Sequence, residues 1–163
     1  MELRFKRALG RLLEAQVDLE TAEFLLEKGI YSRSLFHSQQ SLEKSLKACL
    51  TVKFSGEIRS HLVVGLFKKE VLDFASNLLK KEFSNVLEDA LWVEKRWINT
   101  RYEELDIEKE ELRIPTLIFT TEDAEKGLKT AKKVLNLSRE FLEDYFNEEI
   151  PSTLTDLEKL VKK

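Results

Sequence analysis

The stretch that decides the fold is Ala15–Leu50, AQVDLETAEFLLEKGIYSRSLFHSQQSLEKSLKACL, in which two amphipathic segments meet at Gly29. Before Gly29, apolar residues recur at alternating steps of four and three, which places them on one helix face: Ala8, Leu12, Ala15, Leu19, Ala22 and Leu26. This spacing predicts a helix from about Leu3 to Lys28, ended by Gly29. The second segment predicts a helix from about Ser32 to Phe54, antiparallel to the first because the connection is short.

The rest of the chain continues the helical pattern with one interruption. Two helices are expected between residues 61 and 100, with Ser84 as a cap, whereas the acids and Pro115 in 101–120 predict a loop with an irregular or short-helical middle. Thr120 to Asp123 is a helix start that leads to about Tyr145, and a last short helix is expected from Thr155 to Lys162. The expected fold is an all-α, antiparallel up-and-down bundle of four long helices plus short extra helices. It is expected as a single domain over 1–163, with a core of about 3–147 and a C-terminal extension of about 148–163.

Composition excludes several classes of function. The net charge of −3 argues against a general polyanion-binding surface, which needs an excess of cations. The single cysteine, Cys49, rules out an internal disulfide, and two histidines with one cysteine provide no metal constellation, so no metal and no cofactor are expected. The start of the chain lacks the apolar region of a signal peptide, and no segment has the apolar length of a membrane span. We therefore expect a cytoplasmic protein.

Five short motifs, in order and at compatible spacing, resemble the HEPN family. They span roughly Asp18 to Tyr145, which is most of the chain. The motifs are Asp18-Leu19 with Ala22, Leu25-Leu26 and Gly29-x-Tyr31; Gln39-Gln40, Glu43-Lys44 and Leu46-Lys47-Ala48; Ser60-His61-Leu62; Arg101-Tyr102; and Thr121-Glu122-Asp123-Ala124.

The resemblance implies an antiparallel helical bundle, often a homodimer, with a role linked to nucleotide or RNA chemistry. It also implies a small nucleotidyltransferase as partner, as in toxin–antitoxin pairs. Many HEPN proteins are ribonucleases that use an Arg, four to six spacer residues and a His. That motif is absent here, because Arg33 precedes His37 by three spacers and Arg59 precedes His61 by one. The sequence therefore favours a binding module over an enzyme.

The candidate ligand-binding residues begin on the second helix. Gln40, Lys44 and Lys47 share one helix face, with Glu43 beside them. Lysine ammonium groups there could meet phosphate, and the Gln40 amide could read a base or a sugar. The alternative is a hydrated face in which Glu43 and Lys47 form an ordinary ion pair.

His61, Arg101 and Tyr102 complete the set of candidates. His61 could act as an acid or base near neutral pH, or simply cap the third helix. Arg101 offers a planar fork for phosphate and Tyr102 a ring for a base; alternatively, Arg101 is a cation at a helix C-terminus and Tyr102 packs on Trp97 or Ile98. His37 is expected to be structural, Cys49 an inert buried thiol, and Trp92 and Trp97 core or dimer-interface residues.

Three functions follow as hypotheses. The first is a HEPN-like nucleotide- or RNA-associated binding module whose cleft uses Gln40, Lys44, Lys47, His61, Arg101 and Tyr102. The second is a divergent metal-independent ribonuclease in which His61 moves a proton and Arg101 supports the charge on phosphorus, these two being the candidate catalytic residues. The third is a purely protein-protein interaction module.

Overall fold

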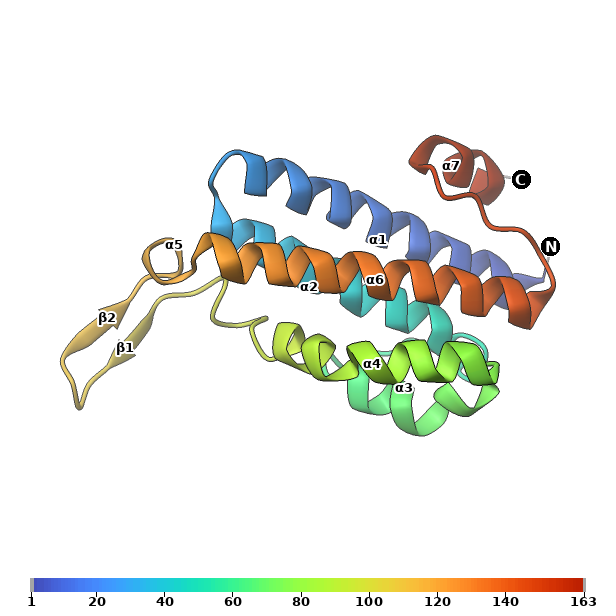
Figure 1. Cartoon of the computed structure of the whole chain (residues 1–163), viewed down its shortest axis with the longest axis horizontal. Coiled ribbons are helices and arrows are strands. Elements are labelled where there is room, and N and C mark those ends of the chain that lie inside the picture. Colours follow the sequence, from blue (N-terminus) through green and yellow to red (C-terminus); the bar gives the residue numbers. More distant parts are fainter. Residues whose placement is uncertain (1, 163) are drawn as a thin grey trace.

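Four long helices form the body of the molecule. The computed structural model describes residues 2–162, and these helices are α1 (Leu3–Glu27), α2 (Tyr31–Leu50), α4 (Asn77–Glu94) and α6 (Thr121–Phe146). Their directions alternate along the chain, since α1 and α4 run toward the end with the β-hairpin and α2 and α6 run away from it (Figure 1). The predicted all-α, antiparallel up-and-down bundle is therefore confirmed.

The shorter elements lie around this body. They are α3 (Val64–Glu70), the 3-10 turn η1 (Leu72–Phe74), strands β1 (Glu104–Asp106) and β2 (Glu111–Arg113), α5 (Pro115–Ile118) and α7 (Leu154–Lys162). Helix α7 folds back against α1, at the opposite end from the hairpin (Figure 1). Among residues 2–162, none of the helices combines the length and the apolar character that a membrane crossing requires.

The α1–α2 hairpin forms as the sequence predicts. Gly29 has a φ of +72°, the left-handed conformation that favours glycine. The amides of Gly29 and Ile30 donate to the carbonyls of Leu26 and Leu25, both at 2.9 Å, which is the Schellman arrangement. Beyond the turn, the Ser34 hydroxyl donates to the Ala22 carbonyl at 2.8 Å and ties α2 to α1.

Helices α2 and α6 run in the same direction and approach closely. The Cys49 thiol faces the Ser138 carbonyl at 3.9 Å, and a Cβ added to Gly127 would collide with Leu35 Cδ1. Ser38 of α2 lies at the same contact, with its Cβ 3.6 Å from the position that such a Cβ would take. Glycine at position 127 is therefore a packing requirement, and α2 becomes the central helix, in contact with α1, α4 and α6.

The boundaries between residues 51 and 100 differ from the prediction. Helix α2 ends at Leu50, before the predicted Phe54. Helix α4 begins at Asn77, and its cap is Ser76, whose hydroxyl accepts a hydrogen bond from the Leu79 amide at 3.4 Å. The prediction that Ser84 is the cap was wrong, because Ser84 lies inside α4 and donates to the Lys80 carbonyl at 2.7 Å.

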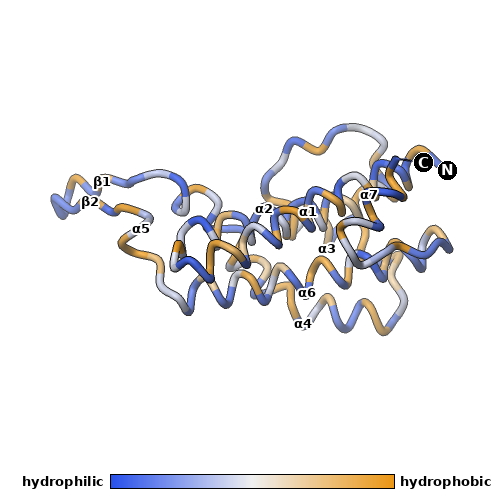
Figure 2. The backbone as a smooth tube through the Cα atoms, turned by 90° about the horizontal axis from the view of Figure 1, so that it is seen from above, coloured by the Kyte–Doolittle hydropathy of each residue, from blue (hydrophilic) through white to orange (hydrophobic). Residues whose placement is uncertain are grey.

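Residues 101–120 are more ordered than a loop. Strands β1 and β2 pair antiparallel, with Leu105 opposite Leu112, and the resulting hairpin projects from the end of the bundle (Figures 1 and 2). The short helix α5 follows. The predicted start of α6 is confirmed as a capping box, in which the Thr120 hydroxyl accepts from the Asp123 amide and the Asp123 carboxylate accepts from the Thr120 amide.

Candidate functional site

Glu43 is the centre of a half-buried polar cluster on α2. Its side chain is 8% exposed and that of Lys47 14%. The Lys47 ammonium donates to Glu43 Oε1 at 2.8 Å, and Gln39 Nε2 donates to Oε2 at 3.0 Å. Gln40 joins the cluster through Gln39, because its amide donates to Gln39 Oε1 at 2.6 Å. The helical spacing of four brings residues 39, 43 and 47 to one face.

The charge state of Glu43 follows from these contacts. Burial alone would raise the pKa of the carboxyl group. Hydrogen bonds from Lys47, Gln39 and His61, together with the lysine's charge, outweigh burial and hold the pKa of Glu43 below its ordinary value. Glu43 is therefore an anion at neutral pH.

His61 reaches this anion from the segment before α3. Its Nδ1 lies 3.2 Å from both carboxylate oxygens of Glu43. Because an ionised carboxylate only accepts hydrogen bonds, Nδ1 is the donor, and this leaves Nε2 available for another partner. The imidazole also stacks on Trp97, with ring centroids 4.7 Å apart and planes at 20°. The ring is thus held in a fixed orientation while about half of it remains exposed.

The capping role considered for His61 belongs instead to Glu94. The carboxylate of Glu94 accepts the amides of Val63 and Val64, at 2.5 and 2.8 Å, at the start of α3. Burial raises the pKa of Glu94, and the nearby Glu43 raises it further, while the two amides lower it. Two buried carboxyl groups therefore have pKa values displaced in opposite directions, the lower one at Glu43 and the higher one at Glu94.

Arg101 also contacts Trp97. The centre of its guanidinium is 4.8 Å from the Trp97 ring centroid, 5.3 Å from that of Tyr102 and 5.4 Å from that of Phe36 on α2. Its Nε donates to the Trp97 carbonyl at 3.0 Å, as expected for a cation near a helix C-terminus. No carboxylate lies within ion-pairing distance of Arg101 in residues 2–162, so its charge is held by aromatic rings without being neutralised.

Lys44 belongs to a different cluster, on the side of α2 that faces α1. Its ammonium contacts Asp18 at 2.5 Å and Glu14 at 3.6 Å. His37 Nδ1 contacts the other oxygen of Asp18 at 2.8 Å, which agrees with the structural role expected for His37. The single helix face proposed for Gln40, Lys44 and Lys47 is therefore divided between two clusters.

The structure thus connects five of the six candidates through shared neighbours. Gln40, Lys47 and His61 are linked through Glu43, and His61, Arg101 and Tyr102 are linked through Trp97 and the guanidinium. Sequence reasoning missed Trp97, which was assigned to the core or an interface, and Glu94. For Trp97, the available sequence signal was that Arg101 follows four positions later, the spacing at which side chains on a helix are neighbours.

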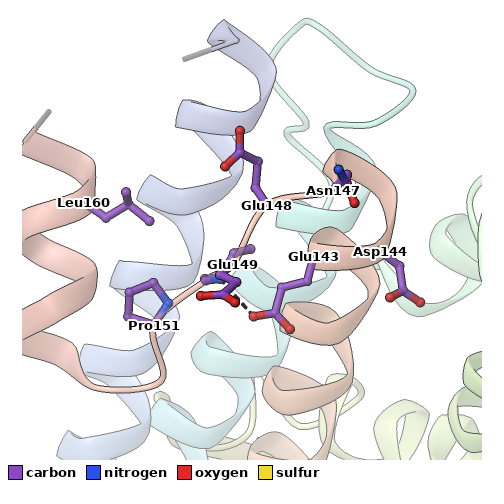
Figure 3. Close-up of a pocket in the computed structure, with 8 residues that line it drawn as sticks. Glu143, Asp144, Asn147, Glu148, Glu149, Pro151 and Leu160 are labelled. Carbon is purple, nitrogen blue, oxygen red and sulfur yellow. Dashed lines mark hydrogen bonds between the residues drawn. The ribbon is translucent and has the colours of Figure 1, made fainter.

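Two cavities lie away from this cluster. One, of about 940 Å³, lies between the end of α6 and α7; Glu143, Asp144, Glu148 and Glu149 make it acidic, and Glu143 accepts the Ile150 amide (Figure 3). Its charge would repel a phosphate. The other, of about 420 Å³ between α4 and α6, is lined by Lys126, Lys129 and Lys133. Two of its lysines are neutralised by Asp89 and Glu82, at 2.9 and 2.7 Å. Within the described part of the chain, no group of His, Cys, Asp and Glu side chains could hold a metal ion.

Comparison with known proteins gives consistent matches. The model of the HEPN domain matches residues 9–142. A protein named "Putative toxin MJ1304" from Methanocaldococcus jannaschii is 35% identical over 134 residues, which cover 81% of this chain and 86% of the relative.

Two crystal structures share the fold. TT1696 from Thermus thermophilus has a TM-score of 0.67 at 24% identity, over 83% of this chain and 98% of that one. ST0689, described as an archaeal HEPN homologue, has a TM-score of 0.62 at 25% identity, over 87% of this chain and 99% of its own. The family match covers most of the helical bundle and the Glu43–His61–Trp97–Arg101 cluster with it, and this chain belongs to the HEPN domain family.

Proposed function

We propose that this HEPN protein binds single-stranded RNA at the cluster formed by His61, Trp97, Arg101 and Tyr102. The observation that carries the proposal is the unneutralised guanidinium of Arg101, which is held against aromatic rings beside an oriented imidazole. A guanidinium presents a planar fork to a phosphate. Tyr102 is well exposed and offers a ring on which a base can stack.

The charge balance of the site suits a single phosphodiester better than a long duplex. The net charge of the chain is −3, so no broad cationic surface is available. Lys47 is neutralised by Glu43, which leaves Arg101 as the main cation and His61 as a hydrogen-bond donor or acceptor through Nε2. Binding would therefore depend weakly on salt, with a slope that corresponds to one or two phosphate contacts.

Binding of a short fluorescent RNA, followed by anisotropy, tests the proposal. Replacing Arg101 by alanine removes a phosphate contact and should weaken binding about tenfold or more, and Tyr102→Ala should weaken it by a similar factor through lost stacking. Arg4→Ala removes the same charge at the opposite end of the bundle and should leave the affinity unchanged. Equal affinities for the wild type, Arg101→Ala and Tyr102→Ala would refute the proposed site.

A second function, metal-independent RNA cleavage, is favoured by the contact between His61 and Glu43. With Nδ1 bound to the carboxylate, Nε2 can take the proton of a ribose 2′-hydroxyl while that oxygen attacks phosphorus. The bond from phosphorus to the 5′-oxygen breaks, the leaving oxygen takes up a proton, and a cyclic phosphate remains. Arg101 would stabilise the charge on phosphorus.

Incubation with RNA in the presence of EDTA tests this second function. Cleavage that yields cyclic phosphate ends and is lost in His61→Ala, and is strongly reduced in Glu43→Gln, would support it. Intact RNA after incubation with the wild type, or cleavage that survives both substitutions, would remove the enzyme and leave the binding module.

We further propose that the chain is the toxin component of a toxin–antitoxin pair whose partner is a small nucleotidyltransferase. The support is the 35% identity to the relative named "Putative toxin MJ1304". Expression of the chain alone should arrest growth of a bacterial host, and co-expression with a nucleotidyltransferase from the same locus should restore it. Normal growth in both cases would argue against the pairing.

A further inference from the structure

A row of lysines on α6 lines the cavity of about 420 Å³ between α4 and α6, which we call the α4–α6 cavity. Lys126, Lys129 and Lys133 follow one another at spacings of three and four, which places them on one face of the helix. At a helical rise of about 1.5 Å per residue, the row is about 10 Å long. Val86 of α4 and Thr130 of α6, both buried, also line the cavity.

A fourth cation, Arg96, lies beside this row through a shared contact with Trp92. The centre of the Arg96 guanidinium is 3.5 Å from the centroid of the Trp92 ring. The Lys126 ammonium is 4.7 Å from the same centroid. Two positive charges thus contact one indole ring, and their mutual repulsion would be relieved by an anion bound beside them.

Two of the four cations have carboxylate partners, but these pairs are exposed to water. Lys126 contacts Asp89 at 2.9 Å and Lys133 contacts Glu82 at 2.7 Å. More than a third of each of these four side chains is exposed. Ion pairs on the surface contribute little to stability, so both lysines can turn toward another anion at small cost.

The other two cations have no such partner. Among residues 2–162, neither Lys129 nor Arg96 lies within ion-pairing distance of a carboxylate. Burial lowers the pKa of Arg96, and the charge of Asp123 raises it. The Asp123 carboxylate, however, accepts the Thr120 amide in the capping box of α6. Four cations therefore surround the cavity against two carboxylates.

We propose that the α4–α6 cavity binds a small polyanion that carries several phosphoryl or carboxylate groups and no nucleobase. Lysine ammonium groups bind either kind of oxyanion as point charges, and the row on α6 presents three of them within about 10 Å. The volume of the cavity falls within the roughly 300–1,000 Å³ of small-molecule sites.

The lining of the cavity explains why a nucleobase is not expected. None of the described residues that line it is aromatic. The nearby Trp92 ring is already in contact with Arg96 and Lys126. A base would therefore lack the stacking surface on which recognition of nucleotides usually depends.

This site is separate from the proposed RNA site. Its cations are Arg96 and the three lysines of α6, whereas RNA is assigned to His61, Trp97, Arg101 and Tyr102. A failure of either proposal leaves the other standing.

Fluorine NMR of the full chain, with fluorotryptophan in place of both tryptophans, tests the proposal. Inorganic tripolyphosphate, titrated at constant ionic strength, should shift the Trp92 resonance saturably with a dissociation constant below about 1 mM, while the Trp97 resonance stays in place. Lys129→Ala removes an unpaired cation and should weaken binding about tenfold. Lys132→Ala is the matched control, since Lys132 pairs with Glu23 of α1 at 3.1 Å, and it should leave the affinity unchanged. The absence of a saturable Trp92 shift, or equal weakening by both substitutions, would overturn the proposal.

Two further ligands identify the chemistry that the cavity selects. Citrate compared with tripolyphosphate distinguishes the two kinds of oxyanion, and the tighter of the two names the source of the charge. ATP carries a triphosphate together with a base, so it should bind no more tightly than tripolyphosphate. A preference for ATP of about tenfold or more would overturn the assignment to a ligand without a nucleobase.

Discussion

Removal of the Glu43 charge should destabilise the protein far more than removal of an exposed carboxylate. Glu43 accepts hydrogen bonds from Lys47, Gln39 and His61 in a site where its own side chain is 8% exposed. Glu43→Gln keeps the shape of the side chain but turns an amide toward groups that are themselves donors. Breaking a buried ion pair from one side commonly costs 3–5 kcal/mol. Because Lys47 retains slight access to water, we expect a loss at the lower end of this range, about 3 kcal/mol.

Urea unfolding followed by far-ultraviolet circular dichroism measures this loss. Glu82→Gln is the control, since Glu82 and Lys133 pair at 2.7 Å but remain well exposed, and this substitution should change the free energy of unfolding little. The double variant Glu43→Gln with Lys47→Met should lose less free energy of unfolding than the two single variants lose together. We expect the difference, which is the coupling energy of the pair, to be about 1 kcal/mol or more. Equal losses for Glu43→Gln and Glu82→Gln would refute the view that Glu43 organises a buried cluster.

Three further predictions concern packing, pH and the thiol. Gly127→Ala should lower the free energy of unfolding by about 1 kcal/mol, because the new methyl group collides with a buried leucine of α2. Gly10→Ala has open space around it and should raise the free energy of unfolding by a similar amount. Thermal unfolding of the two variants compares these effects. The pKa values of Asp18 and Glu43 are held below their ordinary values, because their hydrogen bonds outweigh burial. The stabilisation of the fold by these two carboxylates is complete above their unfolded-state pKa of about 4 and is lost as pH falls through the lower folded-state values. The free energy of unfolding should therefore decline below about pH 5, and a flat pH profile would contradict this. Burial raises the pKa of Cys49 to about 12, so a thiol reagent should modify it only after unfolding; rapid reaction in the native protein would contradict its buried position.

The helical body was predictable because its signals are local and agree with one another. Gly29 ends α1 in the left-handed conformation that its position requires. The Thr120–Asp123 capping box begins α6 with the residue types that such a box needs. The apolar spacing then determines which faces are buried.

The start of α4 could not be decided locally because the same pattern occurs twice. Ser76-Asn77-Leu78-Leu79 and Ser84-Asn85-Val86-Leu87 each offer a hydroxyl followed by apolar residues. The turns that follow Ser76 bury Leu79 and Phe83, so the helix begins at the first pattern and Ser84 becomes an interior residue.

The β1–β2 hairpin was not predicted, for a different reason. Its strands have three residues each, too few to establish a period of two, and its turn lacks the glycine that usually marks one, with Glu110 adopting a φ of +50° instead.

The site was predictable as a set of residue types but not as a set of contacts. Helix spacing placed Lys44 and Lys47 near one another, yet the ammonium group of Lys44 contacts Asp18 of α1 whereas that of Lys47 contacts Glu43 of α2 itself. The partner of His61 comes from 18 positions earlier in the chain, and no local pattern encodes that distance. Trp97, the common neighbour of His61 and Arg101, becomes visible only when the turns after α4 are folded.

The most direct test of the central claim observes the two tryptophans while RNA binds. Trp97 contacts His61 and Arg101 in the proposed site. Trp92 instead contacts Arg96 and Lys126, beside the lysine-lined cavity between α4 and α6. With fluorotryptophan at both positions, fluorine NMR resolves them in one sample. We predict a saturable shift of the Trp97 resonance on titration with short single-stranded RNA, while that of Trp92 stays in place. Saturable RNA binding that moves only Trp92, or neither signal, would contradict the proposed site.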